Sequence, residues 1–254
     1  MDRKNAIVLT VIATATLLVA MIGATFAYFT AQTGTGKSVP VNVTTSTSDS
    51  LNFGGLDPMT IVATQQNFGK DAGSHQATTS GKVTLKANND TAADYCYTVD
   101  LVAQANGLKY AEGADAPAEL VFSISKDDVA VTSIPGLTQI TPLTDHLICK
   151  NPQAETPCTN TETTTVSGFD ITTIANQTIH IPGTETVGTA SIFKIHAEPG
   201  ATVEHEWKAA VTLVNLDSDQ NYNTNTAFAA NLKFETVNCT TGEPVGTPTT
   251  PETP

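Results

Sequence analysis

The stretch VEHEWKAAVTLVNL, residues 203–216, indicates which class of fold this chain adopts. One set of alternate positions is mainly apolar and comprises Val203, His205, Trp207, Ala209, Val211 and Leu213. The positions between them include Glu204, Glu206 and Lys208. Alternation with a period of two residues is typical of a β-strand with one buried face and one solvent-exposed face. The stretch therefore predicts a strand that packs on a core on one side only.

The same alternation recurs on both sides of this stretch, in segments 82–87, 94–103, 119–126, 192–197 and 231–237. A sheet built from such strands is apolar on one side, and two sheets bury that side by packing face to face. We therefore expect an all-β fold, a jelly-roll-like two-sheet β-sandwich, over residues 49–239.

Two segments depart from the alternating pattern. Residues 127–175 are polar, rich in Thr and interrupted by Pro, which predicts a long loop excursion from the sandwich. Residues 240–254, TTGEPVGTPTTPETP, cannot build a core, so we expect an extended Pro/Thr-rich tail. The sequence shows no internal repeat.

The composition is acidic. The 254 residues contain 12 Lys and Arg against 25 Asp and Glu, which gives a formal net charge of −13 and an isoelectric point of about 4.6. A nucleic-acid-binding protein needs clustered basic side chains to neutralise phosphates, and the sequence contains no such cluster. We therefore expect no nucleic-acid partner. The acidic, Thr-rich composition suits a secreted protein.

The N-terminal segment has the pattern of an export signal. Arg3 and Lys4 precede an uncharged, mostly apolar run that continues through Ala27, where small residues mark a cleavage point. We expect a signal helix over residues 1–27 that is cut between Ala27 and Tyr28. The alternative is an uncleaved anchor, because the run is long enough to span a bilayer. In both cases the rest of the chain lies outside the cell, on the surface or in an extracellular matrix.

The segment AQTGTGKS, residues 31–38, matches the pattern of a phosphate-binding loop. Such a loop joins a buried strand to a helix whose N-terminal amides face the phosphates. Here the expected signal precedes the motif, and the β-branched, Pro-interrupted segment VPVNVTTSTS follows it. We therefore expect no nucleotide partner and interpret the segment as a flexible stretch after the cleavage site.

Four cysteines follow the signal segment: Cys96, Cys149, Cys158 and Cys239. An even number in an exported chain predicts disulfides, and four cysteines allow three pairings. Cys149 and Cys158 bracket a short Pro-containing loop, so the simplest pairing joins them and leaves Cys96 with Cys239. The short spacings of a four-cysteine zinc site do not occur.

Motifs for metals and catalysis are incomplete. HEWKA at 205–209 begins like a zinc-protease motif, but Ala209 stands where the second His is required. Asp217, Asp219 and Asn221 have the spacing of the first calcium-loop ligands, without the Gly and Glu that complete such a loop. A polar turn is the favoured interpretation of these three residues. We expect no enzyme activity and no cofactor.

The junction LLVAMIGATFAYFTAQ resembles the processing region of the TasA and camelysin family of secreted Gram-positive surface and biofilm-matrix proteins. In that family a dedicated signal peptidase cuts after a Gly-Thr-aromatic-Ala type sequence, just before an aromatic residue. The matching residues here are Gly23, Thr25, Phe26, Ala27, Tyr28 and Phe29. The expected sandwich is also similar to the soluble part of these proteins.

The resemblance implies a fibre subunit whose freed N-terminal segment inserts as a strand into the sandwich of the next subunit. Residues 28–48 would be this donor segment, through Tyr28, Phe29, Val39, Val41 and Val43. The implied partners are further copies of the chain or related fibre subunits, and the signal peptidase during export. Two alternatives stay open, a monomeric adhesion or carbohydrate-binding module and a camelysin-like metallopeptidase.

Overall fold

The computed structural model describes residues 49–64, 67–68, 73–110, 116–149, 158 and 161–245. All of them belong to one compact unit, Pro40–Pro254. The expected signal helix, cleavage site and donor segment lie outside the described residues, as does the tail after residue 245. Among the residues that are described, no helix is long and apolar enough to cross a membrane.

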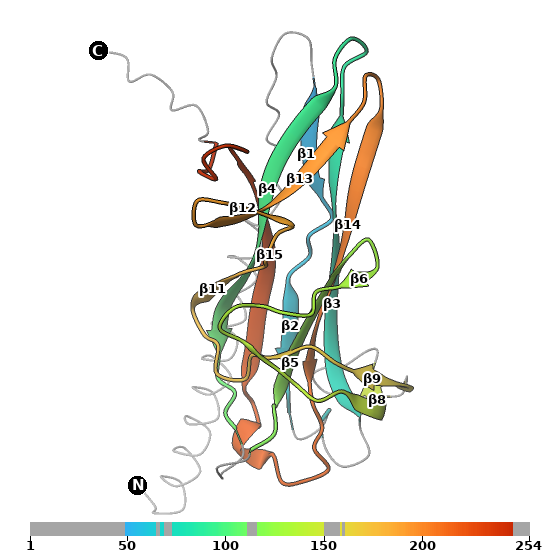
Figure 1. Ribbon diagram of the computed structural model, residues 1–254. Helices are drawn as coiled ribbons and strands as arrows, with labels where there is room; N and C mark the ends of the chain where they lie inside the picture. Colours follow the sequence, from blue (N-terminus) through green and yellow to red (C-terminus); the bar gives the residue numbers. More distant parts are fainter. Residues whose placement is uncertain are drawn as a thin grey trace, which may run out of the picture. The chain divides into compact units, whose positions relative to one another are not determined.

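The first sheet has nine strands within the described ranges, in the order β7-β10-β5-β14-β3-β8-β9, with β1 paired to β3 and β6 paired to β5 (Figure 1). These strands are β1 (Ser50–Gly54), β3 (Ser74–Lys86), β5 (Leu120–Lys126), β6 (Val129–Ala130), β7 (Thr138–Gln139), β8 (Leu143–Cys149), β9 (Thr161–Val166), β10 (Phe169–Asp170) and β14 (Thr202–Leu213). At the centre, β14 lies antiparallel between β3 and β5. This is the strand that the stretch 203–216 predicts.

The second sheet has six described strands in the order β12-β13-β4-β15-β2, with β11 paired to β4. They are β2 (Met59–Val62), β4 (Ala93–Asn106), β11 (Gln177–His180), β12 (Glu185–Val187), β13 (Ala190–Ala197) and β15 (Ala227–Val237). A short 3-10 helix, η1 (Asn221–Asn223), lies between β14 and β15. Alternate residues of β4 face the core, in agreement with the predicted period of two.

The inward faces of the two sheets share one core. Trp207 of β14 and Tyr97 of β4 are completely buried, as are Phe122 and Phe228. The rings of Trp207 and Phe193 meet edge to face with their centroids 4.8 Å apart, which joins the first sheet to the second. The fold is therefore the all-β, jelly-roll-like two-sheet sandwich that the sequence predicts.

The excursion over residues 127–175 carries the five strands β6 to β10, all of which join the first sheet. Part of it covers the outer face of that sheet, where Val121, Ile148, Val166 and Val214 form a small separate apolar cluster. The alternation in β5 places Val121 on the face away from the main core. The excursion supplies the apolar contacts that bury this side chain.

Candidate functional site

One edge of the second sheet is only partly paired. β15 pairs with β4 along nearly its whole length, but on its other side β2 covers only Ala227–Ala230. At the far end of the same side, the backbone N–H of Val245 donates to the carbonyl oxygen of Thr236 at 3.0 Å. No strand in the described part of the chain pairs with Asn231–Glu235 on this side. We call this five-residue segment the open edge.

The alternation of the backbone decides which groups face outward at the open edge. On the side of β15 that faces away from β4, the carbonyl oxygens of Thr226 and Thr236 accept hydrogen bonds from the N–H groups of Ala63 and Val245. Backbone N–H and C=O groups of every second residue in a strand point to the same side. Those of Leu232 and Phe234 therefore point outward along the open edge, which makes it a template for an added strand.

The path of the chain explains why this edge stays open. β1 belongs to the first sheet and β2 to the second, so residues 55–58 cross from one sheet to the other. Gly55 turns at the crossing with a φ of +76°, a conformation that costs glycine little. β2 therefore begins at Met59, opposite Ala230, and does not extend beside Asn231–Glu235. Five strand residues leave about 17 Å of the edge uncovered.

Two disulfides are present, Cys96–Cys239 and Cys149–Cys158. This is the pairing that the sequence favours. Cys96 lies on β4 and Cys239 follows the end of β15, so this bridge ties the two strands together just beyond the open edge. Cys149 ends β8, and Cys158 precedes β9.

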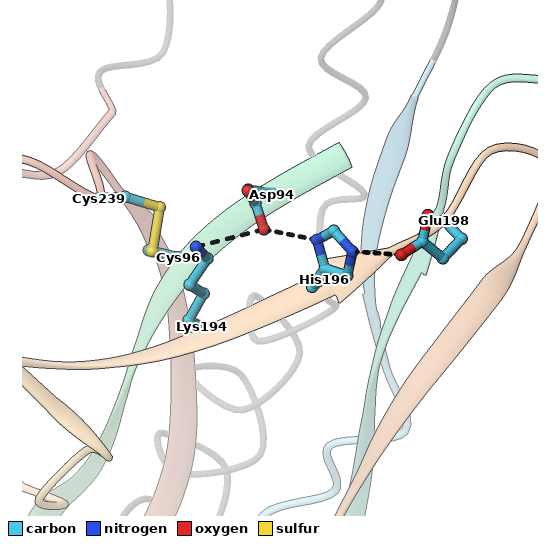
Figure 2. Close-up of polar contacts among 6 residues, drawn as sticks. All are labelled: Asp94, Cys96, Lys194, His196, Glu198 and Cys239. Carbon is cyan, nitrogen blue, oxygen red and sulfur yellow. Dashed lines mark hydrogen bonds and ion pairs between the residues drawn. A yellow bond between two sulfur atoms is a disulfide. The ribbon is translucent and has the colours of Figure 1, made fainter. Parts of the chain in front are cut away.

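A charged cluster lies beside the Cys96–Cys239 bridge on the outer face of the second sheet (Figure 2). The two ring nitrogens of His196 lie 2.8 Å from a carboxylate oxygen of Asp94 and 3.2 Å from one of Glu198. Lys194 forms an ion pair with Asp94 at 3.4 Å. The hydrogen bond to Asp94, followed by that to Glu198, raises the pKa of His196, and the same bond lowers the pKa of Asp94. The cluster is solvent-exposed, so its ion pairs contribute little to stability.

The incomplete zinc-protease motif lies on β14, not on a helix. His205 is half-buried, and its Nδ1 lies 2.7 Å from the hydroxyl oxygen of Tyr97. Burial is the largest influence on the pKa of His205 and lowers it. Glu204 points outward and pairs with Lys82 at 2.8 Å. His205 is therefore a packed histidine of the sandwich, and Glu204 belongs to a solvent-exposed face.

The candidate calcium residues form a turn that is bonded to its own backbone. The N–H of Asn221 donates to Asp219 Oδ1 at 3.0 Å, and the N–H of Asp217 donates to Asn215 Oδ1 at 3.1 Å. These residues line a hollow of about 370 Å³. Within the described ranges, no group of three or more His, Cys, Asp or Glu side chains is placed to hold a metal ion.

Two polar arrangements have no signal in the sequence because they join distant segments. Ser74 Oγ lies 2.6 Å from His146 Nε2, the distance of a nucleophile from its base, but Ser74 is completely buried. A substrate therefore cannot reach this hydroxyl. The buried carboxylate of Glu119 accepts hydrogen bonds from Gln220 and Tyr222 and fastens the segment after β14 to the start of β5.

Comparison with family models, curated proteins and solved structures gives no match to this chain. Function is therefore inferred from the sandwich, its disulfides and the open edge.

Proposed function

We propose that this protein is a secreted structural subunit of a surface or biofilm-matrix fibre of the TasA and camelysin type, assembling by strand donation after signal cleavage. The observation that supports this most directly is the open edge, Asn231–Glu235, on a strand whose neighbouring residues are paired on the same side by β2 and by Val245. An extended peptide added there would supply partners for the backbone groups of Leu232 and Phe234. It would also present every second side chain to the core.

Apolar side chains beside the open edge favour a strand as its occupant. The ring of Phe234 lies 5.6 Å from that of Phe53 on β1, and Phe53 is only half-buried. Leu56 in the crossing segment is also half-buried and packs against the core. A strand with alternate apolar residues would cover both side chains. Burying apolar area adds to the stability of the assembled form at roughly 25 cal/mol per Å².

The donor in this proposal is residues 28–48 of a neighbouring copy. Val39, Val41 and Val43 occur at every second position, which matches the side-chain period of a strand. Lys37 is the only charged residue of the segment, and Asp49 comes directly after the segment. While the segment is joined to the signal it would not be free to insert, so cleavage between Ala27 and Tyr28 would start assembly. The two disulfides are compatible with this extracellular location.

The test is negative-stain electron microscopy of purified residues 28–254 beside the same chain without residues 28–48. A third sample lacks residues 246–254 and controls for the loss of a terminal segment. We expect filaments from the first and third samples and dispersed particles from the second. Filaments from the second sample would show that residues 28–48 are not the donor and would overturn the proposal.

A second pair of variants tests the acceptor. Leu232→Pro removes the N–H that faces the open edge, and Leu232→Val removes similar side-chain volume but keeps that N–H. Within the described residues the N–H of Leu232 has no strand partner, so both variants are expected to fold. We expect filaments from the Val variant only. Equal polymerisation of the two folded variants would exclude this edge as the acceptor.

A trough on the outer face of the first sheet favours the adhesion module as the second candidate function. It has a volume of about 680 Å³ and is lined by Thr78, Ser80, Ser123, Ser125 and Lys208, among others. Hydroxyl and ammonium groups are donors that suit a polar ligand such as a sugar. A glycan array probed with the wild type and Ser80→Leu would test this function. Binding that is lost in the variant supports it, and no binding excludes it.

A further inference from the structure

The β8–β9 hairpin is joined to the first residues of β3. Within the described residues, which on β8 end at Cys149, β3 and β8 pair in parallel at Ser74 with Ile148 and at His75 with Cys149. Among the described strands, β9 pairs only with β8 and forms the end of the first sheet. Side-chain contacts at these two residue pairs add to the backbone hydrogen bonds that attach the hairpin.

Ser74 supplies the first of these side-chain contacts. Its Oγ accepts the backbone N–H of Asn215 at 2.8 Å and lies 2.6 Å from His146 Nε2 on β8. Since a neutral imidazole nitrogen without hydrogen is an acceptor, the hydroxyl of Ser74 donates to His146. Protonation of His146 at this nitrogen removes that acceptor, and a completely buried hydroxyl is left without one.

His75, the next residue of β3, occupies the opposite face of the strand and is completely buried. Its Nε2 donates to the carbonyl oxygen of Asn67 at 2.8 Å, and its ring meets Phe68 edge to face at 5.1 Å. The other nitrogen, Nδ1, is buried and has no hydrogen-bond partner among the described residues. A proton on Nδ1 would place a charge and an unpaired N–H in an apolar site, which is costly.

We propose that His75 and His146 form an acid-sensitive latch, in which their protonation releases the β8–β9 hairpin from β3. One uncharged imidazole thus lies on each face of the junction, that of His75 on β3 and that of His146 on β8, bonded to Ser74. Release would expose the backbone groups at the start of β3 and the apolar side chains of Ile148 and Val166. This inference is independent of the proposed fibre function.

The surroundings of the two histidines favour their uncharged forms. His146 faces Ser74 from β3, Thr164 from β9 and Asp217 from the segment after β14, and Asp145 precedes it on β8. Burial lowers the pKa of His146 more than Asp217 raises it. His75 faces Asn67, Phe68, Leu213 and the disulfide-bonded Cys149, none of which is ionisable, and burial lowers its pKa too.

The direction of the pH effect follows from these lowered pKa values. Above the ordinary histidine pKa of 6.5 both imidazoles are neutral whether the hairpin is attached or released. Below 6.5 the released form takes up protons first. Attachment is therefore lost as the pH falls from 6.5 towards the lowered values.

Hydrogen exchange measured by mass spectrometry on the full chain tests the latch, at about pH 7.5 and about pH 5. After correction for the intrinsic effect of pH, we expect β8 to lose at least about tenfold more protection than β14 at the lower pH. His146→Gln combined with His75→Phe should remove this difference, and the exposed His180→Gln should leave it unchanged. Equal protection of β8 at both pH values in the wild type, or an unchanged loss in the double variant, would overturn the proposal.

A second measurement applies even where the double variant does not fold. Imidazole resonances of the wild type are followed by NMR as the pH falls. We expect His75 and His146 to titrate below 6.5, together with the loss of β8 protection. Titration of both histidines while β8 remains protected would show that their charging does not open the junction.

Discussion

The hydroxyl oxygen of Tyr97 accepts a hydrogen bond from the indole N–H of Trp207 at 3.2 Å, inside the core and between the two sheets. Tyr97 lies on β4 and Trp207 on β14, and both side chains are completely buried. The same oxygen lies 2.7 Å from Nδ1 of His205, to which the hydroxyl donates when that nitrogen carries no hydrogen. Burial, the largest influence, raises the pKa of Tyr97, so the hydroxyl stays protonated.

Tyr97→Phe tests this link. The variant keeps the ring but leaves the indole N–H of Trp207 without its partner, so we expect the free energy of unfolding to fall by about 1–3 kcal/mol. The control is Tyr95→Phe, on the same strand and half-buried, with an expected change within about 0.5 kcal/mol. Both are measured by denaturant unfolding. Equal effects of the two variants would show that the Tyr97 hydroxyl does not stabilise the fold.

The two disulfides should differ in how much they stabilise the sandwich. Cys96–Cys239 spans a sequence separation of 143 residues, and Cys149–Cys158 spans 9. Loop-closure entropy in the unfolded chain predicts a loss of about 5 kcal/mol for Cys96→Ala with Cys239→Ala, and about 3 kcal/mol for the other pair. Unfolding curves of the two double variants give the comparison. A larger loss from the Cys149–Cys158 pair would contradict the entropic account.

Glu119 should contribute strongly to the stability of the fold. Its buried carboxylate accepts hydrogen bonds from the Gln220 amide and the Tyr222 hydroxyl. Glu119→Gln brings an amide N–H₂ into a site that already supplies donors, with an expected loss of about 2 kcal/mol. Exposed Glu185→Gln is the matched control, and thermal unfolding is the measurement. A change no larger than in the control would mean that water replaces these contacts.

The histidines should titrate in a set order, which NMR measures residue by residue. His196 should titrate above 6.5, because Asp94 and Glu198 favour its charged form. His75, His146 and His205 should titrate below 6.5, because burial disfavours their charge. The contacts of His196 therefore stabilise the fold below pH 6.5 and lose this effect as the pH rises through its raised pKa. Asp94→Asn should return His196 towards 6.5, and an unchanged titration would exclude the contact with Asp94.

Strands with large apolar side chains on one face are predictable from sequence. The alternation identifies β14, β4, β5, β13 and the later part of β15. It also places Trp207 and Tyr97 inward and Cys96 on the opposite face. The first half of β3, SHQATTSG, gives no such signal, since its buried positions include Ser74, His75 and Thr79. Segments far away in the sequence cover these side chains and supply their hydrogen bonds. Their burial therefore cannot be predicted from their own hydrophobicity.

The sequence by itself determined the properties that depend on neighbours along the chain. The period of two residues, the acidic composition and the number of cysteines are local or summed quantities, and they define an all-β fold with disulfides. The tertiary structure alone decided that the chain crosses from the first sheet to the second at residues 55–58, so that Asn231–Glu235 has no strand partner on that side among the described residues. It also brought Ser74 to His146. The physical reason is that strand pairing joins residues far apart in sequence, and the packing of the whole sandwich selects those pairs.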